Sequence, residues 1–197
     1  MPLRDILPLL LFVVTATFSP GGATTLATVS GANFGYRRSL PLIAGIAAGL
    51  ASMAALAALG LAGLMLAVPA LQLGMKAAGS AYLLWLAWQT AQRGPPHATA
   101  TAAPVGFLAG LWMLWHNPKA WAMTAGAAAS FATLVPGPER LSLLLGAVFG
   151  TAAVVSLSLW CAAGLGLARL LRSDTQWRVL NIALGVGLAV SVVPVWL

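Results

Sequence analysis

Charge is what this sequence has least of. Only 7% of its 197 residues are charged, whereas 60% are hydrophobic. A soluble domain carries roughly a quarter of its residues as charged side chains, so an ordinary soluble fold is excluded. The formal net charge of +7 does not indicate nucleic-acid binding, because the basic residues are scattered singly or in pairs beside apolar segments. We therefore expect an integral membrane protein, surrounded by lipid.

Acidic residues and cysteine are also scarce. Asp5, Glu139 and Asp174 are the acidic residues, all at the ends of apolar segments, and Cys161 is the single cysteine. One cysteine excludes an internal disulfide or a paired-thiol redox site. Metal sites need several oxygen ligands or clusters of thiolate and imidazole, and the apolar segments carry neither. We expect no metal, no cofactor, no catalytic residues and no enzymatic activity.

Long uncharged stretches predict an all-α fold with six transmembrane segments. A helix needs about 20 apolar residues to cross about 30 Å of hydrocarbon, and the gaps between charged residues are long enough or nearly so. The expected segments are residues 6–32, 40–67, 71–91, 105–134, 141–168 and 179–197, with a polar, proline-rich linker at 93–104. The first segment is interrupted at "SPGG", Ser19 to Gly22, and the fourth at "NPK", Asn117 to Lys119.

The two halves of the chain carry matching markers. Pro20 and Pro118 interrupt the first and fourth segments and lie 98 residues apart. The second marker is a Gly-x-x-x-Gly pair in the second and fifth segments, Gly45 with Gly49 and Gly146 with Gly150. Three spans are an odd number, so a second copy enters the membrane from the opposite side, as in many secondary transporters. We predict two inverted three-helix repeats, residues 1–92 and 105–197. The glycine pairs indicate close helix packing and would also permit a homodimer.

Basic residues predict the orientation. The loops after the first, third and fifth segments carry Arg37, Arg38, Arg93, Arg169, Arg172 and Arg178. The opposite side carries Arg4, Lys76 and Arg140. Cytoplasmic loops are richer in Lys and Arg, so both termini are expected outside the cytoplasm.

The two breaks form the candidate site. A proline inside a helix frees backbone groups, and in hydrocarbon these groups must meet protein or line a cavity. The ends of half-helices carry partial charges that suit a zwitterion. Lys119 at membrane depth costs at least ~2.5 kcal/mol, which favours a cavity or a ligand, although it could also snorkel to the interface. His116 is either a core histidine with satisfied hydrogen bonds or a proton carrier. Each break could also be a simple proline kink.

Three stretches resemble a known family. They are "SPGGATTLATVSGANFGYRRSLPLIAGIAAG", "KAAGSAYLLWLAWQ" and "GFLAGLWMLWHNPKAWAM". In order and spacing they resemble the lysine exporter (LysE/RhtB) family of bacterial amino-acid translocators. The most specific matching residues are Lys76, Gly79, Tyr82, Leu83, Asn117, Pro118 and Lys119. The family usually has Pro-Gly-Pro at the first break, where this chain has Pro20, Gly21 and Gly22.

The resemblance implies a bacterial inner-membrane exporter of amino acids or related small metabolites, energised by the proton gradient. We expect alternating access around a site between the breaks. The candidate substrate-binding residues are Ser19, Pro20, Gly21, Gly22, Asn117, Pro118 and Lys119, with Lys76 and Tyr82 along the pathway and His116 as the proton carrier. The alternatives are a cation exporter of the same architecture, a membrane enzyme or redox carrier, and a membrane assembly subunit that does not transport.

Overall fold

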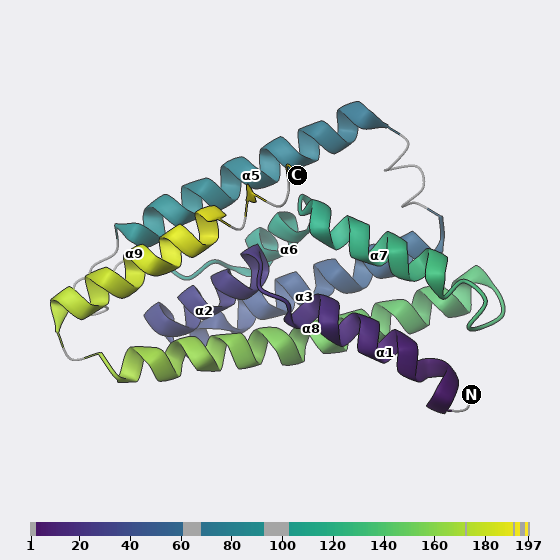
Figure 1. Cartoon of the computed structure of the whole chain (residues 1–197), viewed down its shortest axis with the longest axis horizontal. Coiled ribbons are helices and arrows are strands. Elements are labelled where there is room, and N and C mark those ends of the chain that lie inside the picture. Colours follow the sequence, from purple (N-terminus) through teal and green to yellow (C-terminus); the bar gives the residue numbers. More distant parts are fainter. Residues whose placement is uncertain are drawn as a thin grey trace.

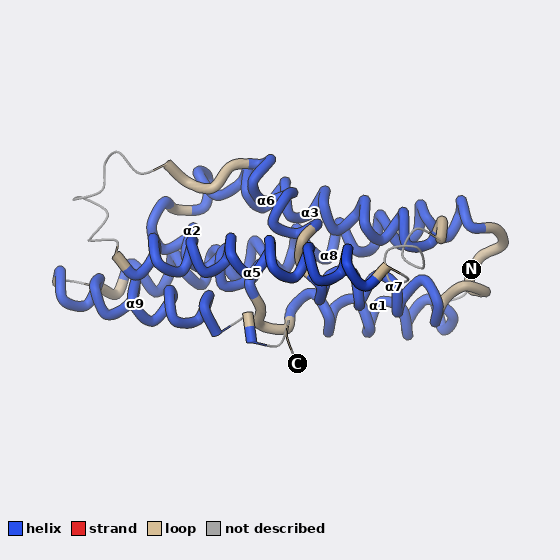
Figure 2. Tube along the Cα trace, turned by 90° about the horizontal axis from the view of Figure 1, so that it is seen from above, coloured by secondary structure: helices blue, strands red, loops and turns tan. Residues whose placement is uncertain are grey.

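The computed structural model describes residues 3–60, 68–92, 103–171, 173–190, 192–193 and 196. Its α-helices are α1 (Leu3–Phe18), α2 (Gly22–Phe34), α3 (Tyr36–Ala58), α5 (Pro69–Ala91), α6 (Phe107–Trp115), α7 (Pro118–Ser130), α8 (Pro138–Arg169) and α9 (Asp174–Val190). Most of them run along one long axis of the molecule (Figures 1 and 2). The described residues contain no strand, so the expectation of an all-α fold is confirmed for them.

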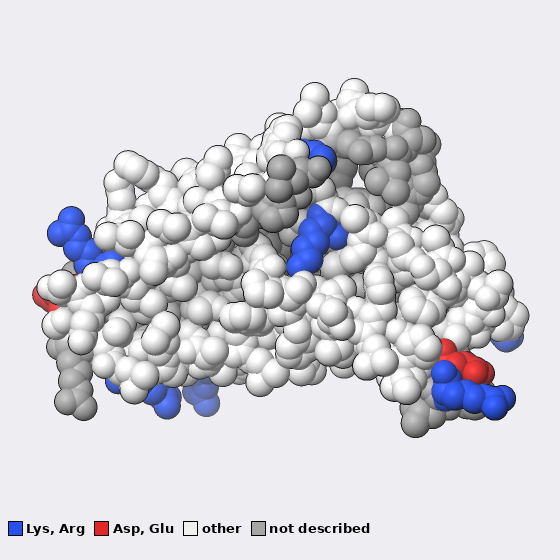
Figure 3. All heavy atoms as spheres, in the orientation of Figure 1, with Lys and Arg blue, Asp and Glu red and all other residues white. Residues whose placement is uncertain are grey.

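Three units of this fold suit a membrane. The helices α3 and α8 are each long and apolar enough to cross one, and α1 with α2 passes as a pair bent by 58° at the first break. Charged side chains gather at the two ends of the molecule, and the face between them is mostly uncharged except for cationic side chains midway (Figure 3). The number of six crossings stays a prediction. The second expected segment runs to residue 67, whereas α3 ends at Ala58, and residues 61–67 lie outside the described part.

Helices α3 and α8 pack against each other and form the centre of the fold. The half-helix α2 packs on α8, whereas α6 and α7 pack on α3, and α5 packs along α9. The central helices carry fully buried apolar side chains, among them Leu42 and Met53 on α3 and Leu145 and Phe149 on α8. This arrangement holds both breaks against the central pair.

Glycines set the closest helix contacts. A Cβ atom at Gly31 of α2 would lie 2.0 Å from the carbonyl oxygen of Cys161, and one at Gly164 of α8 would lie 2.1 Å from that of Thr28. These two glycines therefore face each other's helices, and α2 and α8 touch through their backbones.

A second reciprocal pair joins α3 and α6. A Cβ atom at Gly45 would lie 2.1 Å from the carbonyl oxygen of Phe107, and one at Gly110 would lie 2.9 Å from that of Leu42. Both Gly-x-x-x-Gly motifs also face inward. Gly49 meets α6, and Gly146 and Gly150 meet α3. These faces are used within the chain, so a homodimer, which stays a prediction, needs another surface.

Candidate substrate site at the two helix breaks

The first break lies between α1 and α2 and is closed by hydrogen bonds. The Gly21 N–H donates to Thr24 Oγ1 at 2.9 Å, and the same hydroxyl donates to the Gly21 carbonyl at 3.0 Å. At the end of α1, the Thr17 carbonyl accepts a bond from Ser156 Oγ of α8 at 2.9 Å. These three backbone groups at the break are thus satisfied by protein, as hydrocarbon requires.

The second break is a helix end followed at once by a helix start. Asn117 is the N-cap of α7, and its Oδ1 accepts from the Lys119 backbone N–H at 3.0 Å. Pro118 stands at the first helical position, where its missing N–H costs nothing. The Trp121 indole donates to the Trp115 carbonyl at the end of α6, at 2.8 Å. Asn117 and Pro118 therefore both interrupt the fourth segment and start the helix α7.

This indole bond gives a stability prediction. We expect Trp121→Phe to lower the free energy of unfolding by about 1–3 kcal/mol, because an aromatic ring remains while the part-buried Trp115 carbonyl loses its donor. Trp121 is 3% exposed, whereas Trp88 on α5 is 65% exposed, so Trp88→Phe is the matched control. Thermal unfolding in detergent compares the two variants. Equal melting temperatures would contradict the assigned role of the indole.

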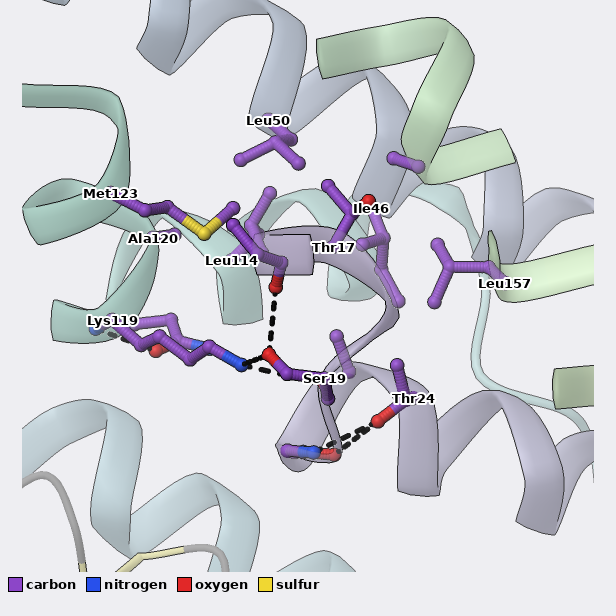
Figure 4. A pocket seen from close by; sticks show the side chains of 16 residues that line it. Thr17, Ser19, Thr24, Ile46, Leu50, Leu114, Lys119, Ala120, Met123 and Leu157 are labelled. Carbon is purple, nitrogen blue, oxygen red and sulfur yellow. Dashed lines mark hydrogen bonds between the residues drawn. The ribbon is translucent and has the colours of Figure 1, made fainter. Parts of the chain in front are cut away.

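Lys119 joins the two breaks. Its ammonium group donates to Ser19 Oγ at 2.6 Å and lies 3.4 Å from the Ser19 carbonyl oxygen (Figure 4). A Cβ atom at Gly21 would lie 3.5 Å from the same nitrogen. Lys119 and Ser19 are 100 residues apart in the sequence. A cation from the second break is therefore held directly at the first break.

A cavity of about 50 Å³ lies between the breaks, and we call it the break cavity. Its polar side is formed by residues of both breaks, namely Ser19, Gly21, Gly22, Thr24, Asn117 and Lys119. Its other side is apolar and is formed by Ile46, Leu50, Leu114, Met123, Ala153 and Leu157, several of which lie across from the Lys119–Ser19 contact in Figure 4. A cavity of this size has room for about three to five water-sized groups.

The remaining candidates lie outside the lining of this cavity. Pro20 and Pro118 shape the backbone of the breaks and do not line it. His116 caps the end of α6, with its Nδ1 atom 2.9 Å from the Trp112 carbonyl oxygen and its ring centre 3.9 Å from that of Trp112. Its ring therefore packs on α6 and does not line the break cavity.

The family-like residues Lys76, Gly79 and Tyr82 lie on α5, which packs against the second break from outside the break cavity. A Cβ atom at Gly79 would lie 2.4 Å from the His116 carbonyl oxygen. Lys76 and Tyr82 stand three residues before and after Gly79, a spacing that places all three positions on one helix face. None of the three lines the break cavity. Lys76 and Tyr82 therefore stay predictions as pathway residues, on a face of α5 that packs against the break.

Some residues that form the break cavity or brace it were not among the candidates from the sequence. Thr24 is signalled by its position three residues after Gly21, which is the spacing of a capping box. No sequence pattern predicted Ser156 or the apolar wall of the cavity, because serine, leucine and alanine occur in every segment.

Residues 14–193 match the family model of the LysE type translocators. The chain belongs to this family. Among the relatives of this LysE type translocator, a cysteine/O-acetylserine efflux protein of Klebsiella pneumoniae is 33% identical over 110 residues, covering 56% of each chain. Proteins with the same description from Escherichia coli strain K12 and Shigella flexneri are 28% and 29% identical over 190 residues, covering 94% of each chain. No solved structure is significantly similar to the chain.

The family assignment confirms two predictions from the sequence. The resemblance to amino-acid translocators is confirmed over most of the chain, and so is the expected function as an exporter of amino acids or related small metabolites. This LysE type translocator is thus a membrane protein with a small-molecule substrate, and its family is one of transporters.

Proposed function

We propose that this LysE type translocator exports small zwitterionic amino acids or their close derivatives across the bacterial inner membrane, and that it binds them in the break cavity. The observation that carries this proposal is the contact of Lys119 Nζ with Ser19 Oγ at 2.6 Å, which joins the two breaks beside a cavity.

The substrate carboxylate binds at Lys119. An ammonium group has three N–H donors, and Ser19 uses at most two of them, so at least one is left for a carboxylate. The N-termini of α2 and α7 both begin at the cavity and add partial positive charge. The cap uses the amide oxygen of Asn117, which leaves its NH₂ group as a donor for the same carboxylate.

The substrate ammonium group and side chain take the other sides. The C-terminal end of α1 carries partial negative charge, and Ala16 and Thr17 at this end line the cavity. The apolar wall accepts only a small side chain, because the cavity has room for few groups. Cysteine and O-acetylserine, which are named for the relatives, are the first substrates to test.

Transport proceeds by alternating access of two inverted repeats, with six spans and both termini outside the cytoplasm. Three features support this proposal. The central helices α3 and α8 pack together, α5 and α9 pack together, and the breaks of both halves meet at Lys119 and Ser19. In each pair the members hold corresponding places in the two halves, as inverted repeats require.

Proton coupling through His116 completes the proposal. The Nδ1 contact with the Trp112 carbonyl favours the tautomer with its proton on Nδ1, which leaves Nε2 to accept a proton. We expect an imposed pH gradient to raise wild-type efflux, and His116→Gln to remove this response without removing efflux. A response that persists in His116→Gln would exclude His116 as the carrier.

The test is efflux from proteoliposomes. Vesicles are preloaded with labelled cysteine under reducing conditions, O-acetylserine, serine, leucine or lysine, and efflux is compared with protein-free vesicles. We expect efflux of the small substrates and little of leucine or lysine. Release of none of the amino acids by correctly inserted protein would overturn the proposal and favour an assembly subunit. Release of a divalent cation alone would favour the cation exporter, although the described residues hold no group of three His, Cys, Asp or Glu side chains that could bind one.

A further inference from the structure

A second and larger cavity lies farther along the same helices. It has a volume of about 580 Å³, and we call it the alanine cavity because alanines, such as Ala57 of α3 and Ala128 of α7, form most of its lining. Leu141, near the start of α8, lines it as well. The helices α3, α7 and α8 thus line both cavities.

One face of α8 connects the two cavities. Leu141 lines the alanine cavity, and Ala153 and Leu157 line the break cavity. Residues four apart share a helix face, so the face that runs from Leu141 to Ala153 passes through Leu145 and Phe149. Leu145 and Phe149 are both 0% exposed. Along α8 they therefore stand as buried side chains between the residues that line the two cavities.

Helices α3 and α7 repeat this pattern. On α3, Leu50 lines the break cavity, Ala57 lines the alanine cavity, and Met53 between them is 0% exposed. On α7, Ala120 and Ala128 line the two cavities, and Thr124 between them is 0% exposed. All three helices thus place a fully buried side chain between the residues that line the two cavities.

We propose that the alanine cavity is the exit route of the substrate and that Leu145, Phe149, Met53 and Thr124 form a barrier between it and the break cavity. This proposal rests on the proposed function, which supplies the outward direction of substrate movement. Phe149 is the largest of the four and is the main obstruction. The few small groups that fit the break cavity pass only when these side chains move apart.

The structure also indicates which helix moves. The half-helices α2 and α6 are locked on α8 and α3 by reciprocal glycine contacts. On α7, a Cβ atom at Gly126 would meet nothing within 4 Å, and the helix starts at the second break. Rotation of α7 about Asn117 and Pro118 then carries Thr124 out of the level of the barrier and opens it.

Cysteine labelling tests the barrier. In a Cys161→Ser background, a single cysteine is placed at Ala128 in the alanine cavity or at Ala153 in the break cavity. A membrane-impermeant maleimide is then added from the outer side of oriented vesicles without substrate. We expect Ala128→Cys to be labelled and Ala153→Cys to be protected. Adding Phe149→Ala to Ala153→Cys should raise its labelling rate at least tenfold.

Control variants distinguish opening of the barrier from a general loosening of the helix packing. Phe107→Ala removes an exposed phenylalanine from α6 and should leave Ala153→Cys protected. Leu145→Ala should act like Phe149→Ala and replaces it if that variant does not fold. Labelling of Ala153→Cys with an intact barrier, or continued protection in both Phe149→Ala and Leu145→Ala, would overturn the proposal. So would labelling of Ala128→Cys from the cytoplasmic side alone.

The result is independent of substrate identity. If Phe149 controls labelling from the outer side but no amino acid is transported, the barrier is supported and only the proposed substrate class fails. If amino acids are transported but Phe149 does not control labelling, the proposed function stands and the barrier is wrong.

Discussion

Lys119→Ala is expected to reduce amino-acid efflux at least tenfold and up to about a hundredfold. A hydrogen bond to a charged group contributes about 1.5–3 kcal/mol, and each 1.4 kcal/mol is a factor of ten. Lys119 also holds Ser19 at 2.6 Å, so its loss removes both a carboxylate partner and the contact between the two breaks. Initial efflux rates of cysteine and O-acetylserine from proteoliposomes measure the effect.

Two variants separate the cation from its position. Arg140→Ala removes a positive charge from the exposed start of α8, far from the break cavity lining, and should leave efflux near the wild-type rate. Ser19→Ala keeps the cation and removes only its hydroxyl partner, so we expect a smaller loss than for Lys119→Ala. Wild-type efflux by Lys119→Ala in protein with an unchanged melting temperature would exclude the proposed site.

The sequence was sufficient to single out the two breaks, which the structure brings together at Lys119 and Ser19. Pro20 and Pro118 stand inside uncharged stretches, and Lys119 is a cation beside one of them, so polarity and backbone geometry both indicate the breaks. The pairing of Lys119 with Ser19 was not predictable. Lysine is long and flexible, and nothing in the order of residues shows which group of the first break it reaches.

His116, Lys76 and Tyr82 lie outside the lining of the break cavity, and no pattern in the sequence indicated this. His116 was a candidate because an imidazole can carry a proton, and in the structure its ring packs on Trp112 and does not line the break cavity. Lys76 and Tyr82 belong to the family-like motif, but they share the face of Gly79, which approaches the second break from outside the cavity lining. Which face of an apolar helix meets its neighbour depends on packing, and a uniformly apolar helix gives little periodic signal for it.

Glycines were predicted as packing positions, but their partners were not. The Gly-x-x-x-Gly pairs of the second and fifth segments stood out by spacing, whereas Gly164 forms no such motif and makes a contact that is as close. Small residues are frequent in all segments, so the sequence does not show which of them are in contact. The predicted segment ends were also approximate. The fourth segment consists of two helices, of which α7 starts at Pro118, and α3 starts at Tyr36 instead of residue 40.

Gly164→Ala is expected to destabilise the protein strongly. Only the other glycines whose Cβ would meet the backbone of a neighbouring helix should be equally sensitive to alanine. The added Cβ would lie 2.1 Å from the Thr28 carbonyl oxygen, whereas carbon–oxygen contacts between helices normally lie at about 3.3–3.6 Å. The obstacle is backbone, which no rotamer change can remove, so α2 and α8 must separate by about 1 Å. Overpacking of this kind costs about 1–3 kcal/mol and occasionally more.

Gly166→Ala is the matched control, two residues along the same helix. A Cβ atom there meets nothing within 4 Å, and alanine is a better helix former than glycine by about 1 kcal/mol. The two variants add the same methyl group to α8, so any general effect of alanine is common to both. We expect the melting temperature in detergent to fall for Gly164→Ala and to stay level or rise for Gly166→Ala. Equal melting temperatures would mean that α2 is not held on α8 by backbone contact, and α2 would then be free to move with the first break. A clear difference means that α2, the half of the first segment after the break, is fixed on α8, which agrees with α7 as the helix that moves in the proposed opening of the barrier.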